Sequence, residues 1–202
     1  MKIFEILPLI QMVGLIGIYC FIFAESGLFF GFFLPGDSLL FTAGVLASAG
    51  YFNFGFLFIG CFVCAVLGDS VGYYFGTKVG PKIFTRQDSF FWNQKNIEKT
   101  NNFYKKYGNK TITLARFVPI IRTFAPIMAG VGKMKYKVFL LWNILGGFLW
   151  VGVVTTLGYF LGNHIKNIDK IILPIILLII FISIVPILFQ FIRERKKIDP
   201  RS

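Results

Sequence analysis

The chain has 202 residues, of which 56% are hydrophobic and 15% charged, and its mean hydropathy is +0.72. This composition is far more apolar than that of an average soluble domain, so we expect one all-helical integral membrane domain over residues 1–202. Lys and Arg number 21 against 9 Asp and Glu, and nearly all of this basic excess lies outside the apolar segments. Anionic lipid headgroups explain that distribution better than nucleic acid does.

The first apolar stretch covers residues 6–24 and would be about 28 Å long as a helix, barely enough to cross a bilayer. The sequence leaves open whether it crosses or lies partly in the interface. No A-x-A cleavage site precedes Glu25, so we expect no cleavable signal peptide.

The three cysteines all lie in apolar stretches, where packing is their expected role. Cys61 and Cys64 form a C-x-x-C pair, but no second pair of ligands accompanies them. We therefore expect neither a metal nor a cofactor.

Residues 25–38 read ESGLFFGFFLPGDS and place Glu25 and Asp37 inside sequence apolar enough to enter a bilayer. An ionisable side chain at that depth costs at least about 2.5 kcal/mol, which makes both residues functional candidates. Pro35 and Gly36 interrupt any continuous helix. We predict a re-entrant hairpin with Asp37 as the N-cap of a helix that starts at Ser38.

A second apolar stretch, residues 52–76, is long enough to span and is interrupted by Asp69. Residues 78–110 then carry eight Lys or Arg against Asp88 and Glu98, with aromatic residues between them. This pattern predicts a basic amphipathic segment over about 81–110 that lies at the headgroup level, with an ordinary solvated loop as the alternative.

Residues 111–132 carry two arginines, Arg116 and Arg122, within apolar sequence. Pro119 and Pro126 make this segment a poor isolated transmembrane helix. We predict a second re-entrant hairpin, because non-helical backbone at membrane depth is tolerated where protein or water covers it.

Two further spans are predicted at residues 138–162 and 171–192, joined by a short link and followed by a basic tail at 193–202. Cytoplasmic segments are enriched in Lys and Arg. We therefore expect residues 78–137 and the tail to be cytoplasmic and the link at 163–170 to lie outside.

The chain contains an internal repeat. A shift of 86 positions aligns residues 41–80 with 127–166 without a gap, and eight of the 40 pairs are identical. The first repeat covers about 25–80 and the second about 111–166. Because the spans of the two copies run in opposite directions, we expect inverted-topology repeats whose hairpins meet near the midplane, as in secondary transporters. The four buried charges would then either form a site or only pin the hairpins together.

The segments E-S-G-L-F, L-P-G-D-S-L-L and R-F-V-P-I-I-R-T-F-A-P-I-M-A-G resemble the DedA family of membrane proteins, also called the VTT-domain group. The resemblance covers about residues 10–165 and includes L-G-D-S-x-G-Y-x-x-G at 67–76 and F-x-x-x-N-x-x-G-x-x-x-W at 139–150. It implies transbilayer movement of lipids. Bacterial members are linked to recycling of undecaprenyl phosphate and to the proton-motive force, and eukaryotic relatives are scramblases.

The resemblance also implies roles for individual residues. Arg116 and Arg122 would bind phosphate, because a guanidinium is a planar, permanently charged fork. Glu25 and Asp37 would be the essential acids that carry protons, because carboxylates held out of water can exchange protons near neutral pH. The secondary candidates are Asp69, Ser38, Thr123 and Asn143.

The partners implied are polyprenyl phosphate, anionic phospholipids and protons, in a multi-pass protein of the bacterial inner membrane with a cytoplasmic C-terminus. Homo-oligomerisation is left open. The alternatives are a less selective phospholipid scramblase, a proton-coupled exporter of small solutes and a passive assembly partner. A membrane phosphatase is disfavoured, because Leu39 and Leu40 follow PGDS where one phosphatase family has arginine, and His164 is the chain's only histidine.

Overall fold

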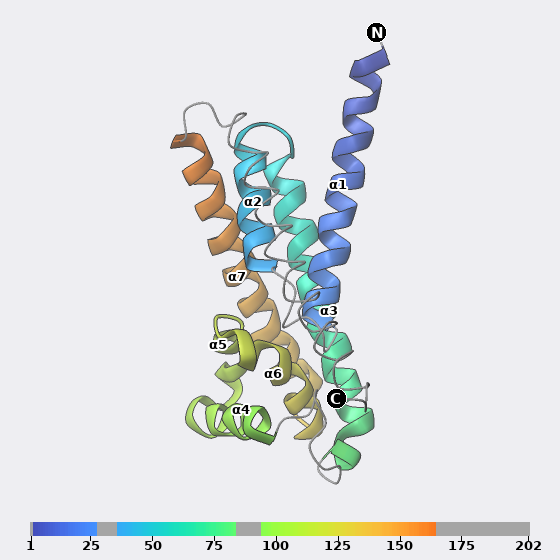
Figure 1. The fold of residues 1–202 in the computed structure, drawn as a ribbon. Coiled ribbons are helices and arrows are strands. Elements are labelled where there is room, and N and C mark those ends of the chain that lie inside the picture. The colour runs from blue at the N-terminus through green and yellow to red at the C-terminus, as the bar shows by residue number, and fades with distance from the viewer. Residues whose placement is uncertain (1, 28–35, 84–93, 165–202) are drawn as a thin grey trace, which may run out of the picture.

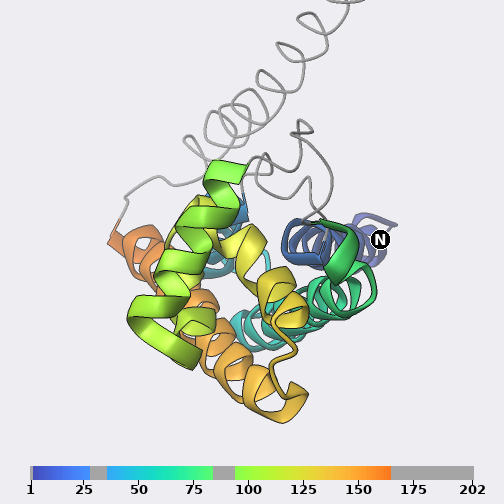
Figure 2. The same cartoon turned by 90° about the horizontal axis from the view of Figure 1, so that it is seen from below.

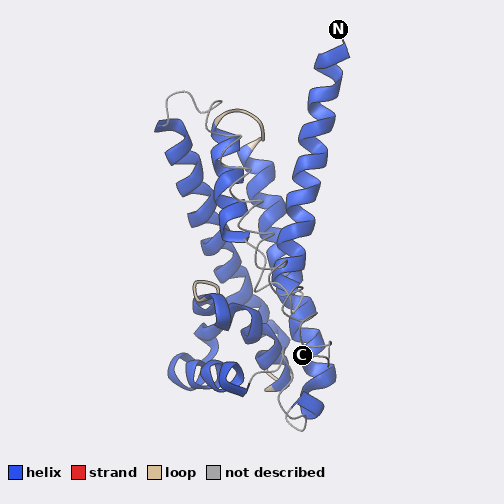
Figure 3. Cartoon of the chain, viewed as in Figure 1, coloured by secondary structure: helices blue, strands red, loops and turns tan. Residues whose placement is uncertain are grey.

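The computed structural model describes residues 2–27, 36–83 and 94–164 (Figure 1). Every regular element in these ranges is a helix, and no strand occurs among them, which confirms the predicted all-helical class (Figure 3). The elements are α1 (Lys2–Gly27), α2 (Gly36–Ser48), α3 (Phe54–Ile83), α4 (Gln94–Tyr107), the 3-10 helix η2 (Gly108–Lys110), α5 (Thr111–Ala115), α6 (Pro119–Val131) and α7 (Tyr136–His164). The predicted span at 171–192, the basic tail and most of the 163–170 link lie outside the described residues.

Among the described residues, two helices are long and apolar enough to cross a bilayer, in agreement with the spans predicted at 52–76 and 138–162. The apolar part of α3, Phe54–Lys78, has 25 residues and is about 38 Å long, against a hydrocarbon core of about 30 Å. The helix α7, with 29 residues, is also longer than the hydrocarbon core is thick. Both helices expose large apolar side chains, such as Phe56 on α3 and Phe148 on α7, which suits contact with lipid.

The pairs α1–α2 and α5–α6 approach these long helices from opposite ends (Figure 1). From the upper end, α1 descends beside α3, and α2 rises again to a turn that leads into α3. From the lower end, α5 leads into α6, which returns to the start of α7. With 13 residues each, α2 and α6 are about 20 Å long, too short to cross a bilayer.

The two short helices pack against the long helices at glycine contacts. A Cβ at Gly44 of α2 would lie 2.3 Å from the Thr155 carbonyl oxygen on α7. A Cβ at Gly130 of α6 would lie 2.2 Å from the Tyr73 carbonyl oxygen on α3. Only glycine allows such a close approach of backbones, as in the small-residue interfaces of membrane helices.

The described part of the predicted basic segment at 81–110 is helical. The helix α3 continues to Ile83, beyond the predicted end of the span. The helix α4 lies across the lower end of the bundle, and its axis runs crosswise to the axes of the long helices (Figure 1 and Figure 2). Lys105 and Lys106 stand in its last turn. This orientation agrees with a helix that lies at the membrane surface.

One local prediction is wrong. Asp37 is not the N-cap of α2, because the helix begins at Gly36 and Asp37 lies in its first turn. Residues 111–132 do not form one continuous helix, as predicted, although Pro126 itself lies inside α6. The break falls at residues 116–118, where Val118 is extended and Pro119 then opens α6. A proline is tolerated in the first turn of a helix because its missing N–H has no partner there.

Candidate functional site

Arg122 joins the two predicted hairpins through its guanidinium group. Its Nη2 pairs with Glu25 Oε1 at the end of α1, and its Nη1 lies 3.2 Å from Asp37 Oδ1 in the first turn of α2. The side chains of Glu25 and Arg122 are 1% and 11% exposed, whereas that of Asp37 is 55% exposed. The structure therefore brings together three of the four charges expected to meet, one of them accessible.

Glu25 also closes the N-terminus of α2. Its Oε1 accepts a hydrogen bond of 3.2 Å from the backbone N–H of Gly36, so a carboxylate from α1 supplies the acceptor expected from Asp37. A carboxylate is favourable there, because the N-terminal end of a helix carries partial positive charge. A Cβ at position 36 would lie 1.3 Å from Glu25 Oε2, so only glycine fits. That Oε2 is buried and has no hydrogen-bond partner in the described part of the chain.

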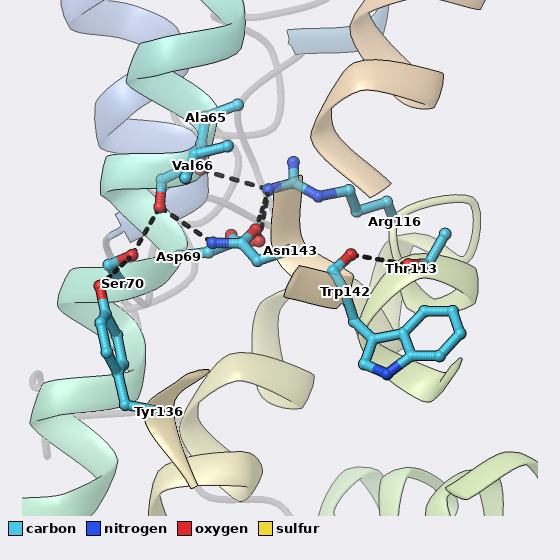
Figure 4. A network of polar contacts seen from close by, with 9 residues as sticks. All are labelled: Ala65, Val66, Asp69, Ser70, Thr113, Arg116, Tyr136, Trp142 and Asn143. Atoms are coloured by element: carbon cyan, nitrogen blue, oxygen red, sulfur yellow. Dashed lines mark hydrogen bonds and ion pairs between the residues drawn. The ribbon is translucent and has the colours of Figure 1, made fainter. Parts of the chain in front are cut away.

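Arg116 belongs to a second, fully buried cluster rather than to the pair of carboxylates (Figure 4). Its Nη2 lies 2.5 Å from Asp69 Oδ2 and 2.6 Å from Asn143 Oδ1. It also donates to the carbonyl oxygen of Ala65 at 3.3 Å. The expectation that Arg116 would meet Glu25 and Asp37 is therefore corrected. Arg116 is the first residue of the break at residues 116–118 and Arg122 lies beyond it in α6, so the two side chains leave the chain in different directions.

Asn143 fixes the geometry of this cluster. Its Nδ2 donates to the Val66 carbonyl oxygen at 3.0 Å, which leaves its Oδ1 to accept from Arg116 (Figure 4). Thr113 donates to the Trp142 carbonyl oxygen at 2.6 Å and ties α5 to α7. Arg116 Nε is buried with no hydrogen-bond partner among the described residues. The cluster thus connects α3, α5 and α7 and keeps one cationic donor unused.

Trp150 ends the motif at 139–150 but is not among the predicted site residues. It lies midway along α7, and its Nε1 donates to Asp37 Oδ1 at 2.7 Å. Its ring centroid lies 5.1 Å from Arg122 Cζ and 5.8 Å from Arg116 Cζ, within the range of cation–π attraction. The signal was its spacing: Asn143 and Trp150 are seven residues apart and therefore share one face of a helix.

The remaining secondary candidates differ in their positions. Asp69 and Asn143 belong to the buried Arg116 cluster. Ser38 is exposed in the first turn of α2, and its carbonyl oxygen accepts from Thr42 at 2.8 Å. Thr123 follows Arg122 and is half-buried, and its side chain makes no hydrogen bond with the described residues of the site.

The charges of the two clusters differ in balance. Arg116 and Asp69 compensate each other, whereas Arg122 faces two carboxylates. An anion that displaces a carboxylate from Arg122 would leave an uncompensated negative charge, which favours uptake of a proton. Within the described residues, no group of three or more His, Cys, Asp and Glu side chains could hold a metal ion.

Comparison with known proteins gives one family and several relatives. The model of the VTT domain matches residues 34–160. The chain is 41% identical to Protein DedA of Escherichia coli (strain K12), over 89% of this chain and 82% of that protein. Inner membrane protein YqjA of the same strain is 31% identical, with 87% and 84% covered. The uncharacterized membrane protein ML0287 of Mycobacterium leprae (strain TN) is 45% identical, with 83% and 74% covered. No solved structure matches the chain.

Proposed function

Because the chain belongs to the DedA family of membrane proteins and contains a VTT domain, we propose that it moves a polyprenyl phosphate, such as undecaprenyl phosphate, across the bacterial cytoplasmic membrane for recycling of the carrier lipid. The observation that carries the proposal is the position of Arg122. Its guanidinium lies between carboxylates of two different helices, α1 and α2, and contacts Trp150 at the middle of α7.

The geometry around Arg122 suits a phosphate headgroup. A guanidinium presents parallel N–H donors that match two oxygens of a phosphate as well as those of carboxylates. Asp37 is the more exposed of the two carboxylates and the more distant from Arg122, so it is the group that a phosphate displaces. Arg116 is almost fully buried, and it attracts the phosphate through its positive charge and its unused Nε. Arg122 is therefore the primary phosphate ligand in this proposal.

The displaced carboxylate couples lipid movement to protons. With phosphate on Arg122, Glu25 and Asp37 face additional negative charge, and protonation of one of them restores the balance. The proton then travels with the loaded site and leaves when the phosphate departs. Coupling to the proton-motive force needs no separate ion site in this scheme.

An inverted-repeat architecture is part of the proposal, and the glycine contacts support it. Gly44 and Gly130 are equivalent under the 86-residue shift, as are Tyr159 and Tyr73. A Cβ at Gly44 would meet the backbone nitrogen of Tyr159 at 3.1 Å, and one at Gly130 would meet the Tyr73 carbonyl oxygen at 2.2 Å. In this proposal α1–α2 and α5–α6 form two re-entrant hairpins that meet at the site.

The orientation follows from the basic residues. Lys78, Lys106, Lys133 and Lys137 lie on segments at the end of the bundle that carries α4 (Figure 1). We assign that end to the cytoplasm and the end at His164 to the outside of a multi-pass inner-membrane protein. The described chain then leaves α7 outside, and a further span would return the C-terminus to the cytoplasm.

The position of His164 supports transport over histidine-based phosphatase chemistry. His164 ends α7, and its Nδ1 lies 2.8 Å from the carbonyl oxygen of Phe160, whereas Trp150 and the arginines lie near the middle of that helix. It is the only histidine of the chain, so no histidine is placed to attack a phosphate held by Arg122.

Proteoliposomes test the proposal. Purified protein is reconstituted with fluorescent undecaprenyl phosphate, and the lipid that reaches the opposite leaflet is measured with and without an imposed pH gradient. We expect transport that the gradient accelerates and that Arg122→Ala abolishes, while Lys106→Ala, which removes a remote surface charge, retains it. No transport above protein-free vesicles would contradict the proposal, and equal rates with and without the gradient would indicate a scramblase.

A further inference from the structure

Trp150 contacts two of the three charged residues of the Arg122 site, Asp37 and Arg122 itself. It is 2% exposed, and its indole N–H donates to the same Asp37 Oδ1 that accepts from Arg122 Nη1. The indole bond, at 2.7 Å, is shorter than the 3.2 Å contact with Arg122. Asp37 is therefore bound more closely to α7 than to α6.

This shared oxygen matters when an anion takes the place of Asp37 on Arg122. The Asp37 carboxylate then loses its cationic partner. A charged group left without a partner costs free energy, and this cost lowers the affinity for phosphate. The indole N–H can keep its bond to Asp37 Oδ1 throughout, because it comes from α7 and not from the arginine. The replacement of Asp37 by phosphate on Arg122 therefore costs less free energy when the indole N–H of Trp150 is present.

We propose that Trp150 is a positioning residue for the phosphate site: it holds Asp37 on α7 while Arg122 exchanges that carboxylate for phosphate. The inference rests on the proposed function and adds a residue to it. The ring contributes through its face, since both guanidinium groups lie within about 6 Å of its centre, a distance at which an aromatic face attracts a cation. Arg122 thus keeps one fixed neighbour in the presence and in the absence of phosphate.

The first test measures binding of farnesyl phosphate, a short prenyl phosphate, to the purified full-length protein. Trp150→Phe keeps an aromatic ring and removes the N–H donor, so we expect about tenfold weaker binding, the size typical of a hydrogen bond to a charged group. Trp142→Phe is the matched control, because Trp142 lies on the same helix with its side chain in the Tyr73, Ile112 and Phe139 cluster. That control should bind as the unaltered protein does.

A double-mutant cycle separates positioning from general structural support. In an Asp37→Ala background the indole has no carboxylate to hold, so adding Trp150→Phe should change the affinity less than twofold. An equal loss in both backgrounds would overturn the inference, because Trp150 would then act independently of Asp37. If Arg122→Ala binds farnesyl phosphate normally, the proposed function itself fails; if Arg122→Ala loses binding and Trp150→Phe does not, only this inference fails.

A spectroscopic measurement decides the matter even where Trp150→Phe does not fold. A protein in which Trp92 and Trp142 are changed to phenylalanine reports emission from Trp150 alone. We expect its emission to shift on addition of farnesyl phosphate and to saturate at the concentration that saturates binding, since Arg122 changes partner against the ring. Saturating binding without a change in Trp150 emission would overturn the inference.

Discussion

At the scale of single residues, the two arginines have different environments, and we therefore propose different roles for them. Arg116 is enclosed by Asp69, Asn143 and the backbone of α3, and Arg122 bridges two carboxylates, one of which is half exposed. A buried ion pair rarely adds net stability, but removal of one partner is costly because a charge is left unpaired. In the proposed function, Arg116 therefore supports the site as much as it attracts phosphate.

Arg122→Lys should lower transport at least tenfold although it conserves the charge. Lysine is a compact point charge and cannot bridge Glu25 and Asp37, or two phosphate oxygens, in the way that a planar guanidinium does. Arg116→Lys should be impaired as well, through loss of the simultaneous contacts with Asp69, Asn143 and Ala65. Transport rates per properly folded protein check both variants, and full activity of both would show that positive charge alone suffices.

Gly36→Ala should damage the site through Glu25. The new Cβ would lie 1.3 Å from Glu25 Oε2, so the carboxylate must leave both the Gly36 N–H and Arg122. Overpacking of this kind costs about 1–3 kcal/mol, and a lower thermal unfolding temperature and weaker transport should accompany it. Gly17→Ala on α1 is the control, because no atom lies within 4 Å of its Cβ position. Equal behaviour of the two variants would show that Glu25 does not close α2.

At the scale of elements, the molecule depends on close packing of short helices against long ones. The contacts of α2 with α7 and of α6 with α3 use backbone atoms on both sides, which a single methyl group would separate. Such contacts hold α2, which carries Asp37, against α7, and they hold α6, which carries Arg122, against α3. A change that separates α2 from α7 should therefore weaken the site from a distance.

Gly158→Ala tests this packing. Its Cβ would lie 2.1 Å from the Phe41 carbonyl oxygen, so α2 must move away from α7 and carry Asp37 with it. We expect a lower unfolding temperature and reduced transport. Gly152→Ala on the same helix is the control, because its nearest neighbour is a Phe58 side-chain atom at 3.5 Å, an ordinary contact. Unchanged stability of Gly158→Ala would mean that α2 and α7 are not packed so closely.

The sequence predicted the elements better than their contacts. Spans at 52–76 and 138–162 follow from apolar length, and the break before Pro119 follows from proline chemistry. The pairing of Arg116 with Asp69 does not, because it depends on how far the chain turns at residues 116–118. The role of Glu25 in closing α2 and the contacts of Trp150 are also long-range, and neither local propensity nor periodicity carries that information.

At the scale of the whole molecule, the orientation that we propose in the membrane rests on the charge distribution. The α4 end carries most of the basic residues of the described part of the chain, and the turn between α2 and α3 lies at the other end beside the end of α7 (Figure 1). Cysteine labelling in sealed cells checks this in a protein whose three native cysteines are replaced. We expect Asn163→Cys to react with an impermeant reagent and Lys106→Cys to be protected. External labelling at position 106 would contradict the orientation and the inverted-repeat proposal with it.

Proton uptake on phosphate binding tests the central claim, the exchange of a carboxylate for phosphate on Arg122, most directly. Calorimetric titration with farnesyl phosphate at pH 7.5, in buffers of different ionisation enthalpy, gives the number of protons bound per ligand. At that pH a phosphate monoester, with a second pKa of about 6, is already mostly a dianion, so its own titration contributes little. The account predicts net proton uptake in the unaltered protein that disappears in Glu25→Gln or in Asp37→Asn. Binding with normal affinity and no proton uptake would contradict it.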